Sequence, residues 1–131
     1  MPCLLDTDVA IHLRNRDPFI LEKIAALPGP PFLSVISQVE MEGGVHAQPG
    51  LAAERRLTLN TLLATVTVLP FDGGEVAAYG RIVAALGFSR RKVADRMIAA
   101  TALAQDLKLI TMNGRDFAGI PGLRLEVWAS P

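Results

Sequence analysis

The chain has 131 residues, half of them hydrophobic, and its 13 basic and 13 acidic residues balance to a formal charge of zero. This length suits one domain with an aliphatic core, and the balanced charge excludes a protein that attracts polyanions through a global positive field. A single cysteine excludes an internal disulfide and a cysteine-based metal site, and no apolar run is long enough to cross a membrane. We therefore expect one domain over residues 1–131, located in the cytoplasm.

Short apolar runs and capped amphipathic segments alternate along the first half of the chain. Apolar runs that end at turn residues predict buried strands, and segments that follow a proline or a capping side chain predict helices. The predicted elements are a strand at 3–5, a helix at 9–13 capped by Asp8, a helix at 19–27 begun by Pro18, a strand at 32–36, a helix opened by Ser37 and limited by Gly43-Gly44, a helix at 51–64 and a strand at 66–69.

The second half continues the alternation. Asp72 and Glu75 have the spacing of a capping box and begin a helix that Gly87 ends. A basic loop at 90–92 leads into an apolar helix of small residues from position 93, a strand at 109–112 that ends at Asn113-Gly114, and a final edge strand at 124–128. This order predicts an α/β fold, a three-layer α/β/α sandwich with a central parallel sheet.

Four acids fall at the ends of predicted strands or on the helical turns that follow them: Asp6, Glu40, Asp95 and Asp116. Crossover connections bring these points to the carboxyl edge of a parallel sheet, where ligand sites of such folds gather. Close pairs of carboxylates repel each other by roughly 4 kcal/mol in a protein-like dielectric. Hard divalent cations such as Mg²⁺ or Mn²⁺ relieve that repulsion, so the pattern predicts a metal centre.

Each acid also has a structural interpretation. Glu40 has the spacing of a capping box with Ser37, Asp95 suits a helix N-terminus, and Asp116 is an ordinary loop residue. Asp6 has no such alternative, because a carboxylate at the end of a strand has no capping duty. Asp8 is expected to be a cap, or an acceptor of hydrogen bonds that supports the metal ligands from behind. Thr111 and Asn113 are expected to shape the loop or to hold Asp116.

Taken together, these segments resemble the PIN domain family and, within it, the VapC-like toxins of type II toxin–antitoxin modules. The resemblance lies in Leu-Leu-Asp6-Thr7-Asp8, Ser37-Gln-Val-Glu40, Asp95-Arg-Met-Ile98 and Thr111-Met-Asn113-Gly-Arg-Asp116-Phe117, four motifs in order along the whole chain. Asp8 departs from the family pattern, where asparagine is frequent.

The resemblance implies an endoribonuclease that depends on Mg²⁺ or Mn²⁺. Its catalytic and metal-binding quartet corresponds to Asp6, Glu40, Asp95 and Asp116, with polar support from Thr7, Thr111, Asn113 and Asp8. The ion would activate water for in-line attack on an RNA phosphodiester, leaving a 5′-phosphate and a 3′-hydroxyl. Family members commonly form homodimers and bind a VapB-like antitoxin across the active-site groove.

Basic residues beside Asp95 are the candidates for binding the RNA backbone: Arg90, Arg91, Lys92 and Arg96. The alternative for this run is a solvated loop. Arg14 and Arg16 are second candidates, and Phe19, Leu21, Ile24 and Leu27 are candidates for an antitoxin groove or, alternatively, for core packing.

Three other functions remain open from the sequence. Asp6-Thr7-Asp8-Val9 also resembles the start of haloacid-dehalogenase-like phosphatases, although the chain lacks their downstream acidic pair. A response-regulator receiver would need a lysine at the end of a late strand, whereas Lys108 begins its strand. A PIN-like scaffold that binds RNA without cleaving it is the third alternative.

Overall fold

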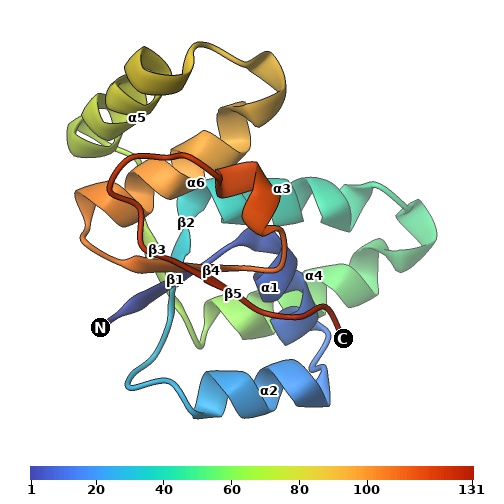
Figure 1. The fold of residues 1–131 in the computed structure, drawn as a ribbon. Helices are drawn as coiled ribbons and strands as arrows, with labels where there is room; N and C mark the ends of the chain where they lie inside the picture. The colour runs from blue at the N-terminus through green and yellow to red at the C-terminus, as the bar shows by residue number, and fades with distance from the viewer.

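The computed structural model covers residues 1–131 and contains five parallel strands in the order β3-β2-β1-β4-β5. The strands are β1 (Cys3–Leu5), β2 (Phe32–Ser34), β3 (Thr67–Leu69), β4 (Lys108–Thr111) and β5 (Leu125–Val127). The helices are α1 (Thr7–Arg14), α2 (Pro18–Ala25), α3 (Val35–His46), α4 (Ala52–Leu63), α5 (Gly73–Leu86) and α6 (Val93–Ala104), with short 3₁₀ turns η1 (Pro49–Leu51), η2 (Arg90–Lys92) and η3 (Gly114–Phe117). The predicted three-layer α/β/α sandwich is confirmed (Figure 1).

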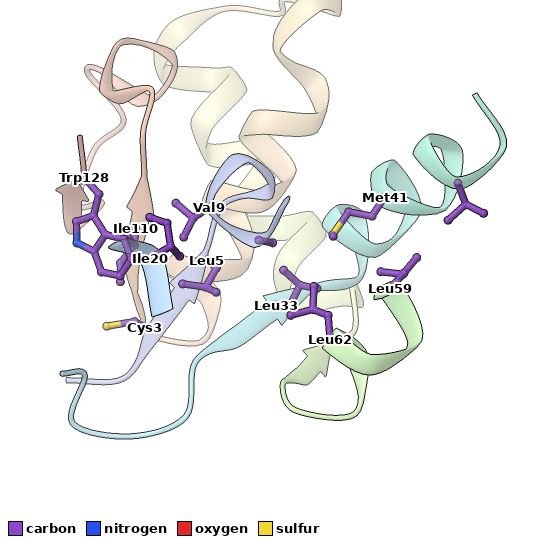
Figure 2. Packing of buried hydrophobic residues seen from close by; sticks show 12 residues of the cluster. Cys3, Leu5, Val9, Ile20, Leu33, Met41, Leu59, Leu62, Ile110 and Trp128 are labelled. Carbon is purple, nitrogen blue, oxygen red and sulfur yellow. The ribbon is translucent and has the colours of Figure 1, made fainter. Parts of the chain in front are cut away.

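Side chains of the central strands alternate between two hydrophobic clusters, one on each face of the sheet. Leu5 and Ile110 point to the cluster covered by α1, α2, α3 and α4 (Figure 2). Leu4 and Leu109 point to the cluster covered by α5 and α6, where small alanines of α6 allow close packing. Both faces of the sheet are therefore buried, which explains why its strands read as continuous apolar runs.

Two predicted helix boundaries were wrong. The second strand ends at Ser34 rather than at residue 36, and the Ser34 hydroxyl accepts a hydrogen bond from the Ile36 N–H, so α3 begins at Val35. The pair Gly43-Gly44 does not limit α3, which continues to His46. Because α3 packs against α4, and Arg55 donates to the Gly44 carbonyl at 2.7 Å, tertiary contacts outweigh the low helix propensity of glycine.

The remaining boundaries differ from the prediction by one to three residues, as at the ends of α2 and β4. The basic run at 90–92 forms the 3₁₀ turn η2 instead of an irregular loop. No helix of the structure is both long and apolar enough to span a bilayer.

Candidate metal centre and active site

The winding of the sheet reverses between β1 and β4. The chain leaves β1 over the face that carries α1 and α2, whereas it reaches β4 from the face that carries α5 and α6. The carboxyl ends of these two adjacent strands thus form a crevice of the kind in which open α/β sheets bind ligands. Asp6 follows β1 at this crevice, and Thr111 ends β4 there.

Asp6 is buried and both of its carboxylate oxygens are hydrogen-bonded. Oδ1 accepts from the Thr7 N–H at 2.8 Å, and Oδ2 accepts from the Thr111 hydroxyl at 2.7 Å. The expectation that Asp6 has no capping duty was wrong, because Asp6 is the N-cap of α1. The Asp6 N–H donates to the Ile110 carbonyl of β4 at 2.8 Å, so the backbone of Asp6 still belongs to the sheet. Helix α1 therefore begins at the next residue, Thr7.

Asp8 is not the cap of α1, since Asp6 is. It has the other expected role, that of an acceptor of hydrogen bonds from groups around the site. Its Oδ2 accepts from the Met112 N–H and from the Asn113 side-chain amide, both at 3.1 Å. The Asn113 N–H in turn donates to the Thr111 hydroxyl oxygen at 3.0 Å. Asp8 therefore ties the start of α1 to the loop that follows β4.

Glu40 reaches the same crevice from α3 and is exposed. The Thr7 hydroxyl donates to Glu40 Oε1 at 2.6 Å and lies 2.8 Å from the Ser37 hydroxyl. The predicted capping box of Ser37 with Glu40 was wrong, since Ser34 is the cap and Ser37 lies inside the helix. Sequence reasoning missed Ser37 as a contact of the site. Its signal was the spacing of three residues, which places it on the same side of a helix as Glu40.

Asp95 and Asp116 complete the acidic set from the other side. Asp95 is in the first turn of α6, Asp116 is in η3, and these two elements pack against each other. Neither carboxylate accepts a hydrogen bond within the chain. Burial, followed by the charges of Asp116 and Glu40, raises the pKa of Asp95 to about 6, against the lowering effect of Lys92.

The same proximity affects Asp6. Burial, followed by the charge of Asp8, raises the pKa of Asp6 to about 7, although hydrogen bonds from Thr111 and Thr7 lower it. The charge of Asp95 also contributes to the increase. The acids of the predicted quartet are therefore neighbours that repel one another, which is the electrostatic condition that a bound cation relieves.

The side chains do not form a ready-made cage, since no three acids lie close enough together to hold an ion. The residues nevertheless fit a hard divalent cation, because all the candidate donors are carboxylate oxygens, the ligands that such cations prefer, and the negative charges of Asp116 and Glu40 act on Asp95. Asp95, Asp116 and Glu40 are at least partly exposed and can turn toward an ion.

The basic residues near Asp95 divide into two groups. Arg90 and Arg91 are exposed, and Lys92 is half-buried. Arg96 is buried, and its guanidinium donates to the Gly87 carbonyl at 2.7 Å, so its predicted contact with RNA is corrected to a structural role in the turn between α5 and α6.

A separate cavity of about 480 Å³ lies between α1, α2 and α4 and contains none of the acidic quartet. Leu21 and Ile24 line it, as do Arg14, Arg16 and the exposed Leu57. Phe19 lies outside it, and Leu27 packs against the hydrophobic core.

The arrangement disfavours two of the alternative functions. A receiver needs its lysine at the carboxyl edge, but Lys108 begins β4 at the opposite edge and pairs with Glu126 at 2.7 Å. A phosphatase of the haloacid-dehalogenase type needs a free nucleophilic carboxylate, whereas both oxygens of Asp6 accept hydrogen bonds and the residue is buried.

Comparison with known proteins agrees with this geometry. The PIN domain family matches residues 3–123. The tRNA(fMet)-specific endonuclease VapC of Salmonella typhimurium is 32% identical over 129 residues, 95% of this chain and 96% of that protein. Ribonuclease VapC10 of Mycobacterium tuberculosis is 36% identical over 117 residues, 84% of this chain and 81% of that protein.

Solved structures show the same relationship. The crystal structure of DNA-bound VapBC from Salmonella typhimurium has a chain that superposes with a TM-score of 0.86 at 26% identity, covering 98% of this chain and 99% of that one. FitAcB from Neisseria gonorrhoeae superposes with a TM-score of 0.73 at 26% identity, covering 94% and 95%. With the acidic crevice, the parallel sheet and these similarities together, the chain belongs to the PIN domain family, among the VapC ribonucleases.

Proposed function

We propose that this chain is an endoribonuclease that depends on Mg²⁺ or Mn²⁺ and acts as the toxin of a VapBC-type toxin–antitoxin module. In this proposal residues 1–131 act as one nuclease domain. The observation that carries it is the convergence of Asp6, Glu40, Asp95 and Asp116 on one crevice, where burial, followed by the negative charges of neighbouring acids, raises the pKa values of Asp6 and Asp95.

Within this proposal each residue has a defined task. The four acids would hold the ion, which would supply Lewis-acid activation of water and charge neutralisation at the phosphate. Thr111 fixes the carboxylate of Asp6, and Asp8 and Asn113 fix the loop after β4. Arg90, Arg91 and Lys92 hold the RNA backbone on the Asp95 side, a contact that salt weakens.

Cleavage of RNA by purified protein tests the proposal. Wild-type protein is incubated with total RNA and with tRNA(fMet), for which the Salmonella relative is named, in Mg²⁺, in Mn²⁺ and in EDTA. We expect cleavage in either metal and none in EDTA. Binding of RNA without cleavage under all conditions would support the non-catalytic scaffold instead.

The cavity between α1, α2 and α4 is the surface that we propose for the antitoxin. Solved relatives include a member of the VapBC family of toxin–antitoxin systems, and this apolar cavity with Arg14 and Arg16 suits an amphipathic segment that carries acids. Leu57→Asp should abolish inhibition by the cognate antitoxin and retain cleavage. Phe88→Asp is the matched control, since both side chains are 68% exposed and Phe88 lies outside the cavity. Homodimerisation and a cytoplasmic location stay predictions of the family resemblance.

A further inference from the structure

Ser37 is fully buried, yet its hydroxyl is directed at the acidic crevice. Its side chain has one hydrogen-bond partner, the Thr7 hydroxyl, at 2.8 Å. The Thr7 hydroxyl lies 2.6 Å from Glu40 Oε1. Three polar side chains are therefore linked in series: the buried Ser37 of α3, Thr7 at the start of α1, and the exposed Glu40 of α3.

The number of available protons determines which group donates in each of these two hydrogen bonds. Each hydroxyl has one proton to donate, and an ionised carboxylate can only accept. The Thr7 proton therefore goes to Glu40, and the contact between the two hydroxyls is made by the Ser37 proton. Donation from Ser37 polarises the Thr7 hydroxyl and strengthens its bond to Glu40.

Glu40 needs this support more than the other fixed acid of the crevice. Its side chain is exposed, and only one of its oxygens, Oε1, accepts a hydrogen bond. Asp6, in contrast, is buried and held through both oxygens. Water cannot replace the Ser37 hydroxyl, because no solvent reaches it.

We propose that Ser37 is a positioning residue that acts through Thr7 to hold Oε1 of Glu40, leaving Oε2 free for the metal ion. The proposal rests on the function proposed above, since it gives Glu40 a task only if the crevice binds a cation. Groups that orient metal ligands in this way commonly change metal affinity or activity by 10- to 100-fold when they are removed.

Ser37→Ala compared with Ser34→Ala is the first test. Both serines are fully buried near the start of α3, but the Ser34 hydroxyl caps the helix and does not contact the crevice. We expect Ser37→Ala to weaken Mn²⁺ binding to the RNA-free protein about tenfold and to lower kcat by a similar factor with KM for RNA unchanged. Ser34→Ala should lower the melting temperature and leave Mn²⁺ affinity within about twofold of wild type, as an effect on stability alone does.

A double-mutant cycle separates positioning from general damage. In a Glu40→Gln background, Ser37→Ala should change Mn²⁺ affinity by less than about twofold, because the group that it positions is already altered. Ser37→Thr, which keeps the hydroxyl, should restore Mn²⁺ affinity toward wild type. If the two substitutions weaken Mn²⁺ binding independently, or if Ser37→Ala matches Ser34→Ala, the positioning role is wrong. A wild-type protein that binds no Mn²⁺ and cleaves no RNA would instead overturn the proposed function itself.

Discussion

The two sides of the acidic crevice are built differently. On the side of β1 and β4, Asp6 is buried and Asp8 half-buried, and both accept hydrogen bonds from loop and strand groups. On the side of α6 and η3, Asp95 and Asp116 accept none. The first side is therefore fixed without a cation, while on the second side no hydrogen bond fixes the carboxylates and the negative charge of Asp116 acts on Asp95. We infer that a cation would order the second side against the first.

The largest effect on RNA cleavage is expected from a substitution on the α6 and η3 side of the crevice. Asp95→Asn should reduce RNA cleavage more than about 100-fold, because removal of a carboxylate weakens metal binding and transition-state stabilisation together. The metal-free variant should unfold at a higher urea concentration than wild type, since the substitution removes a charge that its neighbours repel. A folded Asp95→Asn protein that still cleaves RNA in Mg²⁺ would show that the site is assigned wrongly.

Thr111→Val tests the fixed side. It removes a buried hydroxyl that donates to Asp6, so we expect the free energy of unfolding to fall by about 2 kcal/mol at neutral pH. Urea denaturation at pH 7.5 measures this loss. Asn113→Ala is the control on the exposed rim of the same network and should cost much less. Equal losses in the two variants would contradict the contrast between a fixed interior and an adaptable rim.

The raised pKa values predict how stability depends on pH. Asp6 and Asp95 titrate at about 7 and about 6 in the folded protein, above their ordinary value of 3.8. Since the folded state binds these protons more tightly than the unfolded state, stability should increase as pH falls from 8 to 5.5 and should be lowest above pH 7. Groups with lowered pKa, such as Glu42 and Glu126, act in the opposite direction only below about pH 4.5.

Saturating Mg²⁺ sharpens this prediction. The ion stabilises the charged carboxylates, so the unfolding midpoint at pH 8 should rise with added Mg²⁺, and the gain should shrink as protons compete at pH 5.5. Thermal melts with and without Mg²⁺ at the two pH values measure both effects. A midpoint that is independent of pH in metal-free protein would show that the pKa values of Asp6 and Asp95 are not raised as described.

The smallest effect concerns the basic residues on the Asp95 side. The double substitution Arg90→Gln/Arg91→Gln should raise KM for RNA a fewfold and lower the dependence of KM on salt, because fewer phosphate contacts release fewer counterions. Arg124→Gln is the matched control, since Arg124 precedes β5 at the opposite edge of the sheet. Arg96→Gln should lower stability instead, through loss of its bond to the Gly87 carbonyl.

The sequence allowed prediction of the fold class and of the elements that carry the four acids, because buried strands and helix N-termini leave local signals. It did not predict where α1 and α3 begin. Those starts depend on which N–H groups the sheet has already paired, as with the Asp6 N–H and the Ile110 carbonyl. That pairing joins residues about a hundred positions apart, so no local pattern reveals it.

The site shows the same limit. Spacing indicated that the acids gather, but not that Asp6 is fixed at both oxygens while Asp95 and Asp116 have no partner. Arg96 was misassigned because it follows the basic run Arg90-Arg91-Lys92 closely in sequence, whereas helix geometry turns it toward the core. Ser37 was missed because its role depends on a hydroxyl thirty residues earlier.

The last strand also takes part in building the crevice. Gly114, two residues before Asp116, lies so close to Val127 that an added Cβ would stand 2.9 Å from Val127 Cγ2, and the Trp128 N–H donates to the Thr111 carbonyl at 2.8 Å. The turn that carries Asp116 is therefore shaped against residues that are translated after it. While residues 125–128 are still inside the ribosome, the nascent chain cannot complete this corner, so we expect nuclease activity to arise only after they have emerged.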